Sequence, residues 1–169
     1  RPASIAPEAL TGRTAILFPV YNESVRDVFA TVEATAHALA KIAPGRFECF
    51  ILSDTVSAPT ALEEESGFLN LFSGAVSDCP VYYRRRTINV ARKSGNIHDF
   101  VSRWGGRYEH FLIFDADSYM SAETLVEMAA RMESDPRLGL LQTVPKLIGG
   151  TSLFARVQQF AAAVYGPVL

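Results

Sequence analysis

The stretch His110-Phe-Leu-Ile-Phe-Asp-Ala-Asp-Ser118 places two carboxylates directly after a short apolar run. Phe111 to Phe114 is typical of a strand that is buried on both faces of a parallel sheet. Side chains two positions apart in extended backbone point to the same side, so we expect Asp115 and Asp117 to project together from the strand end. Two neighbouring carboxylates repel each other unless a cation joins them to a further ligand. This favours a divalent cation that also carries phosphate oxygens.

The same stretch also fits a strand that ends in an ordinary turn. In this alternative, Asp117 and Ser118 cap a helix that the apolar spacing predicts over residues 121–132. The spacing of the two carboxylates does not separate the alternatives, so the rest of the chain has to decide between them.

The composition is that of an ordinary globular domain. The chain has 169 residues, of which 49% are hydrophobic and 20% charged, and its net charge of −2 gives no reason to expect nucleic acid as a partner. Cys49 and Cys79 lack the spacing of metal ligands, so buried reduced thiols are expected, with a disulfide as the alternative. No apolar run reaches the ~18 residues of a membrane-spanning helix. Because the chain begins with Arg1 rather than Met, a piece of a longer protein is expected.

Strands and helices are expected to alternate along the chain. Residues 1–13 are interpreted as an extended surface leader, and Asn22 is expected to cap the first helix. The acidic run Glu63-Glu64-Glu65 is expected on a solvated helix face. The patterns predict strands over 14–20, 47–53, 81–84, 111–114 and 138–144, and helices over 22–43, 59–72, 97–104, 121–132 and 152–164. Such alternation predicts an α/β fold with a mostly parallel sheet and helices on both faces.

Polar and charged side chains follow four of these strands. In chain order they are Tyr21 and Glu23, then Asp54, then the basic stretch Arg84 to Lys93, then Asp115 and Asp117. Ligands of open α/β sheets bind beyond the carboxyl ends of the strands, so these side chains are expected to converge on one site. A ligand with anionic phosphates, a metal ion and a polar base or sugar would satisfy all of them. Taken alone, the basic stretch also fits a solvated loop or a contact with anionic lipid.

Several common catalytic patterns are absent from the sequence. Gly95 belongs to no G-x-x-x-x-G-K-[ST] or G-x-G-x-x-G pattern, which disfavours a Walker loop and a dinucleotide fingerprint. His98 and His110 have no nucleophile beside them in sequence, so no Ser-His-Asp or Cys-His arrangement is indicated.

Five short motifs follow one another along the chain. They are Phe18-Pro19-Val20-Tyr21-Asn22-Glu23, Leu52-Ser53-Asp54, Arg92-Lys93-Ser94-Gly95-Asn96, Asp115-Ala116-Asp117-Ser118 and Leu141-Gln142-Thr143-Val144-Pro145. Their types and order resemble those of processive family 2 glycosyltransferases, which have the GT-A-type nucleotide-diphospho-sugar transferase fold. The segments Tyr83-Arg84-Arg85-Arg86 and Val164-Tyr165-Gly166-Pro167 resemble the bacterial branch that makes osmoregulated periplasmic glucans. The resemblance covers residues 14–169.

The resemblance implies a role for each polar group at the predicted edge. Tyr21, Glu23 and Asp54 would line a uridine pocket, and Lys93 with the backbone of Gly95 and Asn96 would lie near the diphosphate or the sugar. Asp115 would face the ribose, and Asp117 would bind Mg²⁺ or Mn²⁺. The implied reaction is inverting transfer of glucose from UDP-glucose to a growing β-glucan acceptor, in a membrane-embedded parent protein at the cytoplasmic face of the bacterial inner membrane.

Two motifs of the family are not found. Gln158-Gln159-Phe160 is not followed by Arg-Trp, and no Asp or Glu occurs after Asp135, whereas the family's general base lies in a later acidic motif. No catalytic residue is therefore identified in the chain, and the general base is expected downstream of Leu169.

General-base catalysis contributes ~10²–10⁴ in rate. Residues 14–169 are therefore interpreted as the donor-binding part of a domain truncated at its C-terminus, close to inert in transfer. The alternatives are a non-catalytic UDP-sugar-binding or regulatory module and, more remotely, a basic module that docks to membranes.

Overall fold

A computed structural model describes residues 10–72, 78–115 and 118–143 of the chain. The residues up to Arg137 form one compact unit, and those from Leu138 onward belong to a second. The elements are β1 (Thr14–Val20), α1 (Val25–Ile42), β2 (Phe47–Ser53), α2 (Ala58–Phe72), β3 (Val81–Arg85), α3 (Arg92–Trp104), a 3₁₀ turn (Gly105–Arg107), β4 (His110–Ile113) and α4 (Ala122–Ser134).

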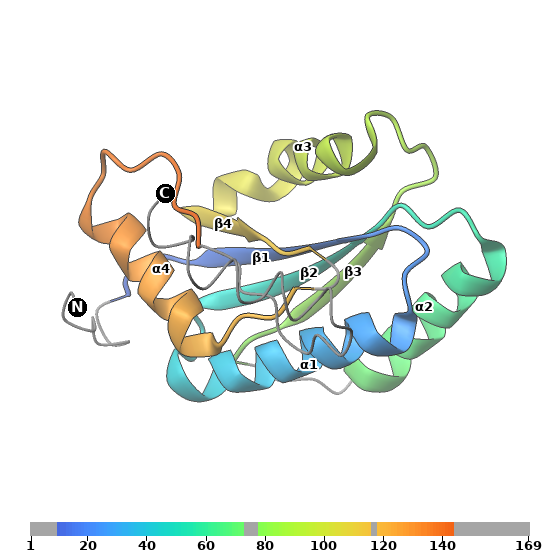
Figure 1. The fold of residues 1–169 in the computed structure, drawn as a ribbon, viewed down its shortest axis with the longest axis horizontal. Helices are drawn as coiled ribbons and strands as arrows, with labels where there is room; N and C mark the ends of the chain where they lie inside the picture. The colour runs from blue at the N-terminus through green and yellow to red at the C-terminus, as the bar shows by residue number, and fades with distance from the viewer. Residues whose placement is uncertain (1–9, 73–77, 116–117, 144–169) are drawn as a thin grey trace, which may run out of the picture. The chain divides into compact units, whose positions relative to one another are not determined.

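The four strands form one parallel sheet in the order β3-β2-β1-β4. Thr14 of β1 is in register with Phe47 of β2 and with His110 of β4, and Cys49 of β2 is in register with Val81 of β3. Helices α1, α2 and α4 cover one face of the sheet, and α3 covers the other (Figure 1). This arrangement confirms the predicted α/β class, the parallel sheet and the placement of helices on both faces.

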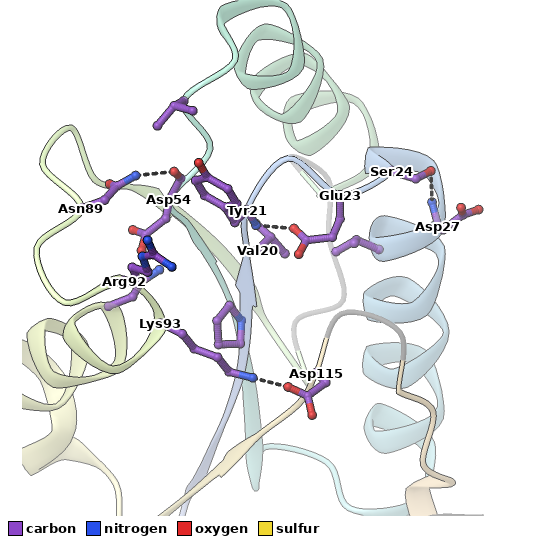
Figure 2. A pocket seen from close by; sticks show the side chains of 14 residues that line it. Val20, Tyr21, Glu23, Ser24, Asp27, Asp54, Asn89, Arg92, Lys93 and Asp115 are labelled. Atoms are coloured by element: carbon purple, nitrogen blue, oxygen red, sulfur yellow. Dashed lines mark hydrogen bonds and ion pairs between the residues drawn. The ribbon is translucent and has the colours of Figure 1, made fainter. Parts of the chain in front are cut away.

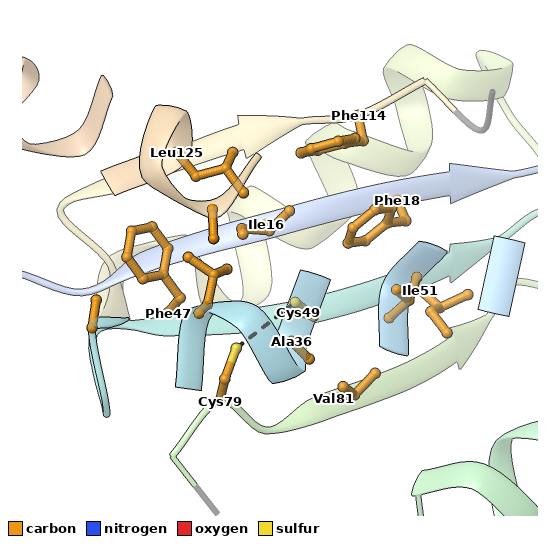
Figure 3. Close-up of a cluster of buried hydrophobic side chains, with 14 of the residues drawn as sticks. Ile16, Phe18, Ala36, Phe47, Cys49, Ile51, Cys79, Val81, Phe114 and Leu125 are labelled. Atoms are coloured by element: carbon orange, nitrogen blue, oxygen red, sulfur yellow. Dashed lines mark hydrogen bonds between the residues drawn. The ribbon is translucent and has the colours of Figure 1, made fainter. Parts of the chain in front are cut away.

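The core is built around β1, whose residues are all buried. Because successive side chains of a strand point to opposite faces, Ile16 and Phe18 pack toward α1 and α4 while Leu17 packs toward Phe100 of α3. Figure 3 shows the larger of these two clusters, in which the rings of Phe18 and Phe114 stack with their centroids 4.9 Å apart. Full burial of a side chain of this size contributes ~1.5–3 kcal/mol, so β1 is a rigid base for the residues that follow it.

Strand β4 is less buried than the sequence predicts. Phe111 and Ile113 are 48% and 43% exposed, so the expectation of burial on both faces is wrong. In register they lie beside Ala15 and Leu17, on the sheet face that α3 covers. However, α3 packs over β1 and β2, and β4 is the outermost strand of the described sheet.

Two helices begin at residues other than those predicted. Ser24, not Asn22, caps α1, because its Oγ accepts a hydrogen bond from the backbone N–H of Asp27 at 3.4 Å. Helix α3 begins at Arg92, five residues before the predicted start at Ile97, so the motif from Arg92 to Asn96 forms a first helical turn rather than a loop.

Three further expectations concern the ends of the chain and the cysteines. Leu10 is 3% exposed and joins the core, which contradicts a surface leader at that position, and residues 138–143 form no strand. The expected helix 152–164 and residues 1–9 lie outside the described residues. Cys49 and Cys79 are buried free thiols with their Sγ atoms 4.0 Å apart, as predicted. The hydrogen bond to Cys79 and burial raise the pKa of the Cys49 thiol. Among the described helices, none combines the length and apolar character needed to cross a bilayer.

Candidate functional site

A cavity of about 1090 Å³ lies at the carboxyl ends of the strands, where the sequence predicted a ligand site (Figure 2). Six of the predicted residues line it: Tyr21, Glu23, Asp54, Lys93, Asn96 and Asp115. Gly95 lines a neighbouring groove with Ser94 and His98 instead.

Two further expectations fall outside the described residues. Asp117, the predicted metal ligand, is one of them, so its role stays a prediction. The general base was expected downstream of Leu169, beyond the residues that the structure describes, and it also stays a prediction. The residues predicted to bind the nucleotide all lie in the described part of the chain.

The turn after β1 forms one wall of this cavity. Asn22 adopts a left-handed backbone conformation with φ 60°, and its N–H donates to Thr55 Oγ1 at 3.0 Å while its Oδ1 accepts from the N–H of Ser57 at 3.2 Å. Glu23 accepts a hydrogen bond from the backbone N–H of Tyr21. Tyr21 itself is 56% exposed and offers its ring to a ligand.

Asp54 follows β2 and is buried in an ion pair. Arg86 donates from Nε to Oδ1 and from Nη2 to Oδ2, both at 2.7 Å, so the pair is bidentate. The side chain of Asn89 also donates to the backbone carbonyl of Asp54. The hydrogen bond to Asp54 raises the pKa of Arg86, which keeps the guanidinium charged. Asp54 therefore fastens the loop after β3 to the end of β2.

The basic stretch is for the most part neutralised by the chain's own acids, so it is not a simple solvated loop. The ion pairs are Arg84 with Asp99 at 2.9 Å, Arg85 with Glu65 at 3.4 Å, Arg86 with Asp54 at 2.7 Å, and Lys93 with Asp115. Arg92 is exposed, lines the cavity and has no ion-pair partner among the described residues.

The first turn of α3 is packed tightly against the loop before it. A Cβ atom at Gly95 would lie 2.0 Å from the carbonyl oxygen of Val90, so this approach requires glycine. Ala91 and Arg92 have φ of 58° and 48°, an uncommon conformation for residues with a side chain. Asn96 is 1% exposed and donates from Nδ2 to the carbonyl of Leu52 at 2.8 Å. Gly95 and Asn96 thus shape the site, and the side chain of Asn96 holds α3 against β2.

Lys93 and Asp115 form the exposed ion pair of the cavity. Their side chains are 48% and 67% exposed, and an ion pair this open to water stabilises a fold by only ~0–1 kcal/mol. Figure 2 shows Lys93 reaching from the start of α3 toward Asp115 at the end of β4. Both groups can exchange this contact for another charged partner at little cost.

The described residues contain no cluster of three or more His, Cys, Asp and Glu side chains that could hold a metal. Mg²⁺ is commonly held by one or two carboxylates, with substrate phosphates and water as its other ligands. Asp115 is one exposed carboxylate of that kind. The alternative that Asp117 and Ser118 cap the next helix is wrong, because Ser121 caps α4 and its Oγ accepts from the N–H of Thr124 at 3.3 Å.

Four polar residues of the cavity were not predicted as site residues, namely Ser24, Asp27, Asn89 and Arg92. Arg92 directly precedes the predicted Lys93, so the basic stretch was the signal for it. Asp27 lies in the first turn of α1, where an acid suits the positive end of the helix. Asn89 is identified only by its long-range contact with Asp54.

A parallel sheet with a charged cavity at the carboxyl ends of its strands defines an α/β protein built to bind a ligand at that edge. The family described as Glycosyl transferase family 2 matches residues 15–167, and the chain belongs to this family. Family membership together with the parallel sheet confirms the predicted GT-A-type fold.

Curated relatives match nearly all of the chain. It is 54% identical over 170 residues to the Glucans biosynthesis glucosyltransferase H of Vibrio cholerae serotype O1, a match that covers 100% of this chain and 24% of the relative. The protein of the same name from Shewanella oneidensis is 52% identical over 170 residues, with coverages of 100% and 23%. That from Shewanella putrefaciens is 54% identical over 158 residues, with coverages of 93% and 22%. The chain thus spans about a quarter of the length of these relatives.

Proposed function

We propose that this chain is the donor-binding part of a glucosyltransferase that uses UDP-glucose and transfers glucose, with inversion, to a growing β-glucan. The observation that carries the proposal is the convergence of six predicted residues on one cavity at the carboxyl edge of the sheet. The names of the relatives support glucosyl transfer in glucan synthesis as the setting. A volume of about 1090 Å³ is sufficient for a nucleotide sugar, since ligand pockets commonly measure ~300–1,000 Å³.

The cavity separates groups suited to the two ends of such a donor. Tyr21 presents an exposed aromatic ring at the wall of the cavity, a stacking surface that suits a uracil base. Asp54, whose carboxylate is held by Arg86, shapes this end of the cavity. Arg92 and Lys93 at the start of α3 present cations that suit a diphosphate. Transfer of the sugar leaves negative charge on the departing UDP, and fixed cations lower the energy of the state in which that charge develops.

A divalent metal ion, Mg²⁺ or Mn²⁺, fits the proposed site. Asp117 would hold the ion, and Asp115 would face the ribose. The ion would add Lewis-acid neutralisation of the diphosphate. Lys93 would exchange its ion pair with Asp115 for a contact with a phosphate oxygen of the donor.

The proposed setting of the parent enzyme is osmoregulated periplasmic glucan synthesis at the cytoplasmic face of the bacterial inner membrane. The glucan acceptor and its activating base belong to that larger assembly. Donor binding is the step proposed for the residues of this chain, which contains no Asp or Glu after Asp135.

Isothermal titration calorimetry tests the proposal. UDP and UDP-glucose are expected to bind in the presence of Mn²⁺, and binding is expected to weaken when the metal is chelated or when Asp117→Ala is used. ADP and ADP-glucose serve as matched ligands with the wrong base. Absence of UDP binding with Mn²⁺ present, or equal affinity for ADP and UDP, would contradict the proposal. UDP-galactose and UDP-N-acetylglucosamine in the same series test the choice of glucose.

A further inference from the structure

Glu64 of α2 is a buried carboxylate outside the cavity that the proposed function does not use. It is 2% exposed, whereas its neighbours Glu63 and Glu65 are exposed, so the expectation of a solvated acidic face is wrong at this position. A buried carboxylate is costly unless it is fully hydrogen-bonded. Glu64 is therefore expected to have hydrogen-bond donors close by.

Three hydroxyl groups donate to the Glu64 carboxylate. Ser53 Oγ and Tyr83 OH donate to Oε2 at 2.6 and 2.9 Å, and Thr55 Oγ1 donates to Oε1 at 2.6 Å. Burial, followed by the hydrogen bond to Glu64, raises the pKa of Tyr83, so its hydroxyl remains a donor. Tyr83 lies on β3, Ser53 ends β2 and Thr55 follows it. Glu64 thereby ties both strands to α2.

Thr55 connects this buried group to the wall of the cavity. While it donates its single proton to Glu64, its Oγ1 accepts the backbone N–H of Asn22 at 3.0 Å. Asn22 holds the left-handed conformation of the turn between Tyr21 and Glu23, which both line the cavity. A chain of hydrogen bonds therefore runs from Glu64 through Thr55 to the turn after β1.

The direction of these bonds depends on a group that only accepts. The Glu64 carboxylate accepts from three hydroxyls, so Thr55 donates its proton to Glu64 and the lone pairs of Thr55 Oγ1 remain for the N–H of Asn22. A glutamine in its place would turn an N–H₂ group toward Thr55, or else toward Ser53 and Tyr83. Either orientation removes an acceptor from a buried hydroxyl, and the first removes it from the hydroxyl that holds Asn22.

We propose that Glu64 is a positioning residue for the donor site, which acts through Thr55 to hold the Tyr21–Glu23 turn in its binding conformation before the ligand arrives. The inference rests on the proposed function, because it assigns a role within the same site. The proposal also predicts that loss of the Thr55 hydroxyl weakens binding, whereas loss of the Tyr83 hydroxyl does not.

Four variants test this assignment by calorimetry with UDP and Mg²⁺. Glu64→Gln and Thr55→Val are expected to weaken UDP binding by about tenfold. Loss of a residue that orients the directly binding groups typically lowers affinity by ~10–100-fold, and this expectation takes the lower value. Tyr83→Phe removes a hydrogen bond to the Glu64 carboxylate, but Tyr83 lies on β3, away from the Tyr21–Glu23 turn. Glu63→Gln repeats the Glu-to-Gln change on the exposed face of α2. Both are expected to stay within about twofold of the wild type.

Hydrogen exchange of the Asn22 amide in the ligand-free protein gives a second readout that needs no nucleotide. Exchange is expected to accelerate in Glu64→Gln and Thr55→Val and to remain unchanged in Tyr83→Phe, with the amides of α1 as an internal reference. Wild-type protein that fails to bind UDP would refute the proposed function, and the exchange data would still decide the role of Glu64.

The proposal is overturned if Glu64→Gln and Thr55→Val leave the exchange of the Asn22 amide unchanged. It is also overturned if UDP affinity follows thermal stability alone across the variants, so that Tyr83→Phe weakens binding as much as Thr55→Val does. Thr55→Val carries the test if Glu64→Gln does not fold.

Discussion

The amino and carboxyl edges of the sheet both carry charged side chains, and they use them differently. At the amino edge the chain itself satisfies three carboxylates. Glu48 accepts from Tyr108 OH at 2.6 Å, Glu109 from the N–H of Arg13 at 2.6 Å, and Glu133 from the N–H of Gly12 at 2.9 Å. These acids hold the segment before β1 and the loop before β4 in place.

At the carboxyl edge the charges divide into two groups. Asp54 and Arg86 are closed in a buried pair, with side chains 6% and 12% exposed. Lys93 and Asp115 form an exposed pair, and Arg92 has no ion-pair partner in the described part of the chain. The contrast teaches that a charge saturated by the chain supports the fold, whereas an exposed charge at the strand ends remains available to a ligand.

The largest effect is expected from opening the buried pair at the carboxyl edge. Arg86→Ala leaves Asp54 buried without its partner, which should lower the free energy of unfolding by ~3–5 kcal/mol. Chemical denaturation measures the change. Arg103→Ala removes an exposed partner of Asp99 and is the control, with an expected loss below about 1 kcal/mol. If Arg86→Ala lowers the free energy of unfolding no more than Arg103→Ala does, the Asp54–Arg86 pair does not support the fold.

The next largest effect is expected on binding, from removal of the exposed cations. Lys93→Ala and Arg92→Ala should each weaken UDP binding by about 10-fold or more, because a charged hydrogen bond contributes ~1.5–3 kcal/mol and 1.4 kcal/mol is tenfold. Their stabilities should change by less than about 1 kcal/mol. Arg85→Ala removes a cation of the same stretch that pairs with Glu65 outside the cavity, and its UDP affinity should be unchanged. Calorimetry and denaturation of the same samples separate the two effects.

The smallest effect is expected at the amino edge, as a dependence of stability on pH. The hydrogen bond from Arg13 lowers the pKa of Glu109. Partial burial alone would raise the pKa of Glu133, but hydrogen bonds from Thr11 and Gly12 outweigh it and lower that pKa as well. A carboxyl group whose folded pKa lies below its unfolded value stabilises the fold above the unfolded value, about 4.3 for Glu, and loses this contribution as the pH falls through the folded pKa.

Stability should therefore decline as the pH falls below about 4.3. Denaturation between about pH 5 and 3 should show a shallower decline for Glu133→Gln than for the wild type, because one of the titrating groups is gone. The cost of Glu133→Gln at neutral pH is expected to be about 1 kcal/mol, the ordinary contribution of a hydrogen bond. A slope identical to that of the wild type would show that Glu133 does not support the amino edge through its charge.

The architecture and the position of the site follow from local patterns in the sequence. The apolar run of β1 has the predicted bounds, and the side chains after four strands converge because the carboxyl ends of parallel strands meet at one edge. The burial of Glu64 could not be predicted, because the hydroxyls that satisfy it lie on two other elements. The same holds for Asn22, which resembles a helix cap in sequence but bonds to Thr55 and Ser57, 33 and 35 residues away.

Mapping UDP and Mg²⁺ onto the sheet by two-dimensional ¹H–¹⁵N NMR tests most directly whether the carboxyl edge is the donor site. Addition of UDP with Mg²⁺ should shift the amide signals of Tyr21, Arg92, Lys93 and Asp115, while those of Glu48, Glu109 and Glu133 stay in place. Shifts at the amino edge without shifts at the carboxyl edge, or no shifts at saturating UDP, would contradict the proposed site.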